Sequence, residues 1–287
     1  MAGLSVPGGL RLERTSARAW RAFADRIQWL GALLIFAVQI VLTIPHTLRQ
    51  YGKEVLRLLA ELAFGSRLLA VMASTIVVVV ILSTAVGIEV GVEGVQGLQV
   101  IGLAPLGGFL SAFGNTREIA PLITGFGIAA QLGCRFTSQL GAMRISEEID
   151  ALEVMAVPPL PFLVTTRAIA SMVAILPLYL ISLAGAYICT ELAITKLGNV
   201  GSGTYTYYFH SILTGRDVAY SVAKVAIFAV IVTVVHCYYG YHADGGPEGV
   251  GRATGRAIRT SIVSIAIVDM LLTLLFWGSN TGIHLSG

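Results

Sequence analysis

The chain has 287 residues, of which 55% are hydrophobic and only 12% are charged, and its mean hydropathy is +0.80. These values exclude a soluble globular domain and indicate an integral membrane protein. The net charge of +3 is small, and the basic residues gather ahead of the first apolar run, which is typical of a membrane-facing arm and not of a nucleic-acid partner site.

The N-terminal part of the chain is basic before it becomes apolar. Five arginines stand at positions 11, 14, 18, 21 and 26. We therefore predict a basic cytoplasmic arm over 1–26 and an interfacial or elbow helix region over 27–66, in which 27–45 lies flat on the membrane. A cleaved signal peptide is not expected, because the first apolar run lies far from the start and ends in Thr43-Ile44-Pro45.

Five transmembrane helices are predicted within a domain at 67–287, near 67–90, 105–140, 165–190, 220–243 and 255–279. The apolar runs lack the alternation of barrel strands, so the fold class is all-α. With the N-terminus cytoplasmic and the C-terminus on the outer side, fifteen of the nineteen Lys and Arg residues are cytoplasmic, as the positive-inside rule favours. The glycine-rich run 94–116 predicts a broken or partly re-entrant entry into the second span.

An acidic element, RISEEIDALEVMAVPP, follows the second predicted span at 144–159. Ser146 is a suitable N-cap and Pro158-Pro159 a suitable end, so we predict a short cytoplasmic helix over about 144–157. One face is apolar and consists of Ile145, Ile149, Leu152 and Ala156. Anionic lipid would repel the acidic flanks. The apolar face therefore packs either on the chain's own bundle or in a groove of a protein partner.

Three of the charged residues inside the predicted spans are candidate functional residues. Arg117 and Glu118 stand in the outer half of the second span, and Asp269 stands in the last span. Intramembrane charges usually face a cavity or a partner. Arg117 either forms an ion pair or meets an anionic head group in a lipid pocket, and Asp269 needs a donor from elsewhere in the bundle or a proton.

Metal and catalytic sites are not expected. His236 and His242 do not share a helix face. The glycines of GGPEGVG lack the Lys-Ser/Thr pair of a phosphate-binding loop. Neither a catalytic carboxylate pair nor a nucleophile triad stands out, so we predict that the chain is not an enzyme.

Three motifs resemble those of one family. LGAMRISEEIDALEVMAV at 140–157, GYHADGGPEGVGRATGRAI at 240–258 and REIAP at 117–121 are similar to segments of the MlaE/YrbE permeases, which are the membrane subunits of ABC-type lipid transporters that work with MCE proteins. The long basic N-terminus is most similar to the actinobacterial YrbE proteins, with the B-type member as one candidate.

The resemblance implies a role for the acidic element as a coupling helix that sits in a groove of a cytoplasmic ATPase. Its implied contact residues are Glu147, Glu148, Ile149, Asp150, Leu152, Glu153 and Met155. Arg117, Glu118 and Asp269 become candidates for the substrate path. ATP and Mg would bind to the partner ATPase, and this chain would bind no cofactor.

The implied function is that of a permease subunit in the bacterial inner membrane, which moves a fatty acid, mycolic acid or sterol-like lipid, with import as the usual direction. The implied partners are the ATPase, MCE proteins on the outer side and a second YrbE-type permease. Gln131 and Gln139, the latter within Ser138-Gln139-Leu140-Gly141, stand where the family commonly has an Arg and a Glu, which favours a heterodimer over a homodimer. The alternative function is a membrane scaffold that anchors MCE proteins without transport.

Overall fold

A computed structural model describes residues 9–64 and 69–278, with side chains at Ala24, at 27–59 and at 77–278. These residues are helical with short connections and contain no strand, which confirms the predicted all-helical class. The elements that form the main body are α1 Gly9–Gln50, α2 Gly52–Phe64, α3 Leu69–Val100, α5 Ala120–Ile128, α6 Cys134–Ile145, α8 Thr166–Leu192, α10 Gly215–Tyr241 and α11 Gly246–Trp277.

Six helical segments of the described chain are long and apolar enough to cross a membrane. They are Ile27–Gln50, Val77–Val100, Ala104–Ile145, Leu160–Leu197, Gly215–Tyr241 and Gly246–Trp277. Five of them correspond to the predicted spans, and the first is the segment that the charge distribution assigns to the interface. Helices suit this setting because each one satisfies its own backbone hydrogen bonds.

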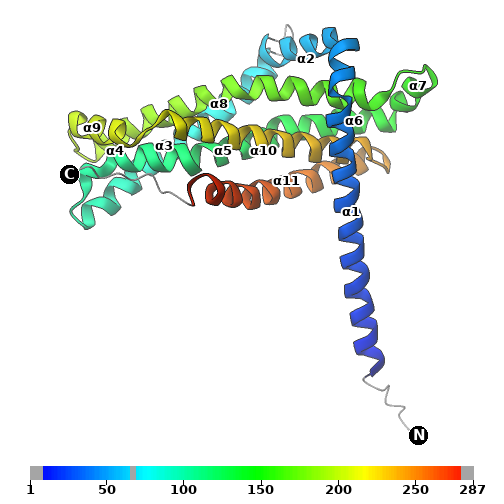
Figure 1. The fold of residues 1–287 in the computed structure, drawn as a ribbon, viewed down its shortest axis with the longest axis horizontal. Coiled ribbons are helices and arrows are strands. Elements are labelled where there is room, and N and C mark those ends of the chain that lie inside the picture. The colour runs from blue at the N-terminus through cyan, green and yellow to red at the C-terminus, as the bar shows by residue number, and fades with distance from the viewer. Residues whose placement is uncertain (1–8, 65–68, 279–287) are drawn as a thin grey trace.

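The five later segments form a bundle in which α3, α8, α10 and α11 run side by side with α5 and α6 (Figure 1). Helix α3 packs on α8, and α10 packs on α6, α8 and α11. Small residues allow the close approach of α3 and α8: a Cβ atom at Gly87 would lie 2.8 Å from the carbonyl oxygen of Ala186. Large buried side chains such as Phe228 and Ile265 fill the centre.

Helix α1 has a different direction. It runs across the long axis of the bundle, near the end where α6 and α7 (Glu148–Val154) lie (Figure 1). Phe36 and Ile40 on one face of α1 are buried against the bundle, whereas Leu34, Ile35 and Leu42 are exposed. This crossing direction and wide apolar surface are features that an interfacial helix would show, and the interfacial placement stays a prediction. Residues 1–8 of the predicted basic arm lie outside the described residues.

The second span is more continuous than the sequence predicts. It begins at the 3-10 turn η1 Ala104–Leu106 and α4 Gly107–Leu110, and it continues through the π-helical turns η2 Ser111–Ile119 and η3 Ala129–Gly133 to the end of α6. The predicted break falls at 101–103, where Gly102 has a φ of 71°. It is shorter than the whole glycine-rich run because α3 extends to Val100.

The remaining elements close the two ends of the bundle. The π-helical turns η4 Leu160–Thr165 and η5 Ala193–Leu197 flank α8. Helix α9 Ser202–Ile212, which the sequence analysis did not predict, packs on α4 at the end of the bundle opposite α7 (Figure 1). The C-terminal residues 279–287, to which the predicted outer C-terminus belongs, lie outside the described residues.

Candidate functional site: a buried charge cluster and an acidic helix

The first candidate site is a charge cluster of five residues from three helical segments: Arg117, Glu118, Asp217, Lys224 and Asp269. The first two belong to η2 in the second span, Asp217 and Lys224 to the first turns of α10, and Asp269 to α11. These elements meet near the end of the bundle away from α7. The structure therefore brings together all three candidates for the substrate path.

Arg117 is held on all sides by the protein. Its Nη2 atom lies 3.2 Å from Oδ1 of Asp217, and its guanidinium group stacks 4.4 Å from the ring centroid of Phe113 and 5.0 Å from that of Trp277. The indole N–H of Trp277 donates to the same Asp217 oxygen at 2.7 Å. Arg117 is only 6% exposed, so in this structure it is an interhelical ion-pair residue and its guanidinium group does not line an open pocket.

Lys224 is the centre of the other half of the cluster. Its side chain is fully buried, and its Nζ atom lies 2.6 Å from Oδ1 of Asp269 and 3.4 Å from Oε2 of Glu118. The ammonium group also donates to Thr273 Oγ1 at 2.9 Å, and that hydroxyl donates to Glu118 at 2.6 Å. Asp269 thus has the donor from elsewhere in the bundle that its position in an apolar span requires.

The motif REIAP explains how Lys224 is fixed. Pro121 has no N–H group, so it cannot close the usual helical hydrogen bond to the carbonyl oxygen of Arg117, four residues earlier. The ammonium group of Lys224 donates to that carbonyl oxygen at 2.7 Å. The proline therefore leaves a backbone acceptor for the buried lysine, and the surrounding turn is π-helical, a form that is frequent at functional sites.

The second candidate site is the acidic helix α7. Its N-cap is Glu147, in the left-handed conformation with a φ of 61° and without a side-chain cap. The predicted N-cap role of Ser146 is wrong, because α6 continues to Ile145 and the Ser146 hydroxyl donates back to Ala142 O at 3.0 Å. Ser146 also donates to Glu148 Oε1 at 3.0 Å.

The apolar face of α7 is divided between the chain's own core and the surface. Ile149 is fully buried in a core with Phe136 and Leu140, and Leu152 packs on that core. Ile149 and Leu152 therefore hold α7 on the bundle and are not free anchors for a partner. Val154 and Met155 are 89% and 64% exposed. They are the large apolar side chains that are exposed at the end of α7 and that a partner could contact.

The acids of α7 remain at the surface. Glu147, Glu148 and Glu153 are exposed, and Asp150 forms an exposed ion pair with Arg144 at 2.6 Å. Such a pair contributes about 0–1 kcal/mol to stability. The acids thus add negative charge to the surface of the α7 region, which projects at one end of the bundle (Figure 1).

Comparison with known protein families shows which family this chain belongs to. The family description "Permease MlaE" matches residues 64–275, which is most of the chain and contains both candidate sites. The chain belongs to the MlaE permease family. Proteins similar to this chain include a chloroplastic protein of Arabidopsis thaliana named TRIGALACTOSYLDIACYLGLYCEROL 1, which is 30% identical over 195 residues. They also include probable ABC transporter permease proteins of Rickettsia felis and Synechocystis, which are 32% and 31% identical over 166 and 180 residues.

The matched regions cover part of each protein. They are 68% of this chain and 56% of the Arabidopsis protein, 56% and 62% for the Rickettsia protein, and 61% and 66% for the Synechocystis protein. This MlaE family chain therefore spans little more than half the length of the plant relative, and the resemblance found in the three sequence motifs is confirmed at the level of the family.

Sequence reasoning missed several residues of these sites. Lys224 was only assigned, through its charge, toward the outer side, and Asp217 and Trp277 were not considered. His236 was expected only not to bind a metal; it is fully buried in α10, with Nδ1 2.8 Å from Thr137 Oγ1 and Nε2 3.2 Å from Ser261 Oγ. The signal for Lys224 was its position in an apolar helix, which requires an acid on a neighbouring helix.

Proposed function

We propose that this chain is the membrane-spanning permease subunit of an ATP-driven lipid transporter. Its membership of the MlaE permease family and its six membrane-length helices support this function. Related proteins are named as probable ABC transporter permeases, and the plant relative is named for a galactosylated diacylglycerol, which is a lipid. ATP and Mg bind to a separate ATPase in this proposal, and the permease itself is not the hydrolase.

The exposed part of α7 carries the proposal, because it is the surface that an ATPase would bind. Val154 and Met155 supply apolar contacts, and Glu147, Glu148 and Glu153 supply charges that pair with basic groups on the ATPase. Charges of this kind set orientation and partner choice more than raw affinity. In this arrangement Ile149 and Leu152 transmit force, since they fasten α7 to the core of the permease.

The proposed orientation places the α7 end in the cytoplasm. Arg135, Arg144 and Arg167 belong to segments that approach this end, as do the three arginines of α11 at 252, 256 and 259, and the positive-inside rule favours a cytoplasmic position for them. The charge cluster and α9 then lie toward the outer side, where MCE proteins would bind. A second, related permease would complete a heterodimer in the bacterial inner membrane.

Within this function the charge cluster borders the substrate path. Glu118 has 35% of its side chain exposed, whereas Lys224 and Asp269 have 0% and 6%. Glu118 is therefore the member that a passing lipid can touch. We assign positioning roles to Arg117 and Asp269, which act through Asp217 and Lys224. The cargo class is a fatty acid, mycolic acid or sterol-like lipid, moved inward.

A pair of valines provides the test. Val154 in α7 and Val100 at the end of α3 are 89% and 87% exposed, but only Val154 belongs to the proposed ATPase contact. Val154→Asp should reduce copurification of the ATPase from native membranes about tenfold or more, as expected for an interface anchor, and should reduce cellular lipid uptake with it. Val100→Asp should leave ATPase copurification unchanged.

The same experiment separates a transporter from a scaffold. A scaffold that only anchors MCE proteins would keep its outer partners and its cellular function after Val154→Asp. Unchanged ATPase copurification and unchanged uptake in this variant would contradict the coupling role of α7.

A further inference from the structure

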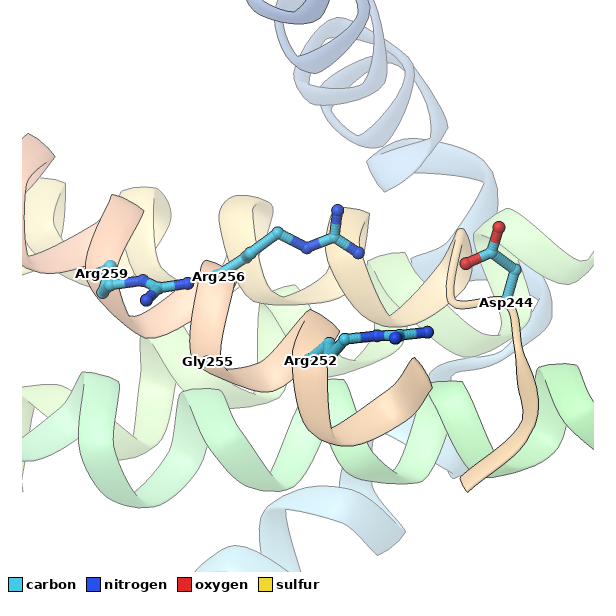
Figure 2. Close-up of a pocket in the computed structure, with 5 residues that line it drawn as sticks. All are labelled: Asp244, Arg252, Gly255, Arg256 and Arg259. Carbon is cyan, nitrogen blue, oxygen red and sulfur yellow. The ribbon is translucent and has the colours of Figure 1, made fainter. Parts of the chain in front are cut away.

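An arginine-lined hollow of about 440 Å³ lies at the end of the bundle where α11 begins, and it belongs to neither candidate site. Its lining residues are Asp244, Arg252, Gly255, Arg256 and Arg259 (Figure 2). In Figure 2 the side chains of Arg252 and Arg256 extend toward the side of Asp244, and Arg259 extends toward Arg256. The volume lies in the range of small-ligand sites.

The hollow has an excess of positive charge. The three arginines are exposed, and Asp244 is the single acid among the lining residues. Arg252 has an acid of its own, since its Nη1 atom lies 3.2 Å from Oε1 of Glu248. For Arg256 and Arg259, the described part of the chain supplies no ion-pair partner. An anion of matching geometry would therefore meet two guanidinium groups, which bind phosphate through paired N–H donors.

The arginines continue into an apolar stripe on the same face of α11. From Arg252 the face passes through Arg256 and Arg259 at steps of four and three residues, and it continues through Val263, Ile267, Met270 and Leu274, which are 58%, 57%, 65% and 57% exposed. From Arg259 to Leu274 the helix rises by about 22 Å. This length accommodates an acyl chain that extends from a head group at the arginines.

Aromatic side chains mark the level of the membrane surface beside the hollow. The guanidinium group of Arg256 lies 5.9 Å from the ring centroid of Tyr239, whose ring lies 6.2 Å from that of Trp29 in α1. Trp and Tyr gather at the level of lipid head groups. The indole N–H of Trp29 is buried without an acceptor in the described structure, so this aromatic pair retains an unused donor.

We propose that this hollow binds the phosphate head group of an anionic lipid from the leaflet at the α7 end, with the lipid tails along the apolar stripe of α11. The positive charge of the hollow, the length of the apolar stripe and the position of the aromatic rings all favour an anionic lipid. A soluble phosphate would not contact the stripe. The site rests on the proposed placement in the membrane but not on transport, so lipid binding and transport can fail separately in experiments.

Lipid binding to the purified full-length protein, with its copurifying partners, tests the site. Native mass spectrometry would compare phosphatidylglycerol with phosphatidylcholine in wild type, in Arg256→Gln/Arg259→Gln and in Arg256→Lys/Arg259→Lys. Basic residues near a membrane surface attract anionic lipid, and the glutamine variant lacks two of them. It should therefore bind phosphatidylglycerol about thirtyfold more weakly. The lysine variant should retain most of that affinity. Phosphatidylcholine binding should be nearly equal in all three proteins.

A matched control removes the same charge from the other end of the molecule. Lys196→Gln/Arg216→Gln takes away two exposed basic residues and should leave phosphatidylglycerol binding unchanged. Equal binding by wild type and by the arginine-to-glutamine variant would overturn the proposal, as would displacement of the lipid by millimolar inorganic phosphate. A third result would also overturn the proposal: the arginine-to-glutamine variant no longer copurifies with a second permease chain but binds lipid as wild type does. The stripe would then be a contact between subunits and not a lipid site.

Discussion

Replacement of Lys224 by methionine should strongly destabilise the protein. The Lys224 side chain is fully buried and lies 2.6 Å from Asp269 and 3.4 Å from Glu118. Lys224→Met keeps most of the length of the side chain but leaves Asp269, which is only 5% exposed, as a buried carboxylate without its cation. Removal of one partner of a buried ion pair costs about 3–5 kcal/mol. We expect a loss near the lower value, about 3 kcal/mol, because Glu118 is partly exposed to solvent.

A double-variant cycle tests the cause of this loss. Lys224→Met/Asp269→Leu removes both charges of the pair, and replacement of a buried ion pair by apolar residues is often neutral or stabilising. The double variant should therefore regain at least about 2 kcal/mol relative to Lys224→Met. Lys196→Met changes an exposed lysine and should alter the free energy of unfolding by less than about 0.5 kcal/mol.

The free energy of unfolding would be measured in mixed micelles by titration with a denaturing detergent, with tryptophan fluorescence and far-UV circular dichroism as the two signals. A loss below about 1 kcal/mol for Lys224→Met, together with additive effects in the double variant, would refute the reasoning. That result would mean that solvent or lipid head groups reach Asp269 in the membrane.

The remaining predictions concern the end of the bundle at α4 and α9. Gly108→Ala should cost about 1–3 kcal/mol, because its Cβ atom would lie 2.2 Å from the backbone oxygen of Tyr205. Gly97→Ala, in open space within α3, should be neutral or stabilise by up to about 1 kcal/mol. The same unfolding titration checks both, and equal losses would contradict the packing argument. Tyr205→Phe should cost about 1 kcal/mol through the hydrogen bond that its hydroxyl donates to Ser111 at 2.9 Å. Burial raises the pKa of Tyr205 from 10.0 to about 12. The folded protein therefore keeps this proton longer than the unfolded chain, and the associated stability is present below pH 10 and is lost as the pH rises toward 12. This loss should be absent from Tyr205→Phe, and identical pH profiles of unfolding for the two proteins would contradict it.

The sequence was sufficient to predict the helical spans, because hydropathy is a local property. Each of the five predicted spans corresponds to a helical segment of membrane length, since the bilayer leaves the backbone no alternative to internal hydrogen bonds. Helix ends were harder to predict. Ser146 has the side chain of an N-cap, but a hydroxyl can equally bond back to the preceding turn, and α6 extends far enough for Ser146 to donate to Ala142.

Contacts between residues far apart in the chain could not be predicted from sequence patterns. A periodic apolar face on α7 is equally compatible with its own core and with a partner, and only the packing of Ile149 on Phe136 and Leu140 decides between them. Similarly, Asp269 requires a donor on physical grounds, but the identity of that donor depends on the rotation of α10 relative to α11. Lys224 meets this need from 45 residues earlier in the chain.

The second span offers a mechanical connection between the two candidate sites. It is one helical segment of 42 residues, Ala104–Ile145, and corresponds to about 60 Å at the rise of an α-helix. Arg117 and Glu118 lie in its first part, and α7 follows directly on its last turn. Movement of α7 by an ATPase would therefore act on the charge cluster through a continuous rod. Because Lys224 bonds both to this rod, at the Arg117 carbonyl, and to α11, at Asp269, a shift of the second span must either break the cluster or carry α10 and α11 with it. Since breaking the cluster exposes buried charges, the fold favours joint movement of the three helices.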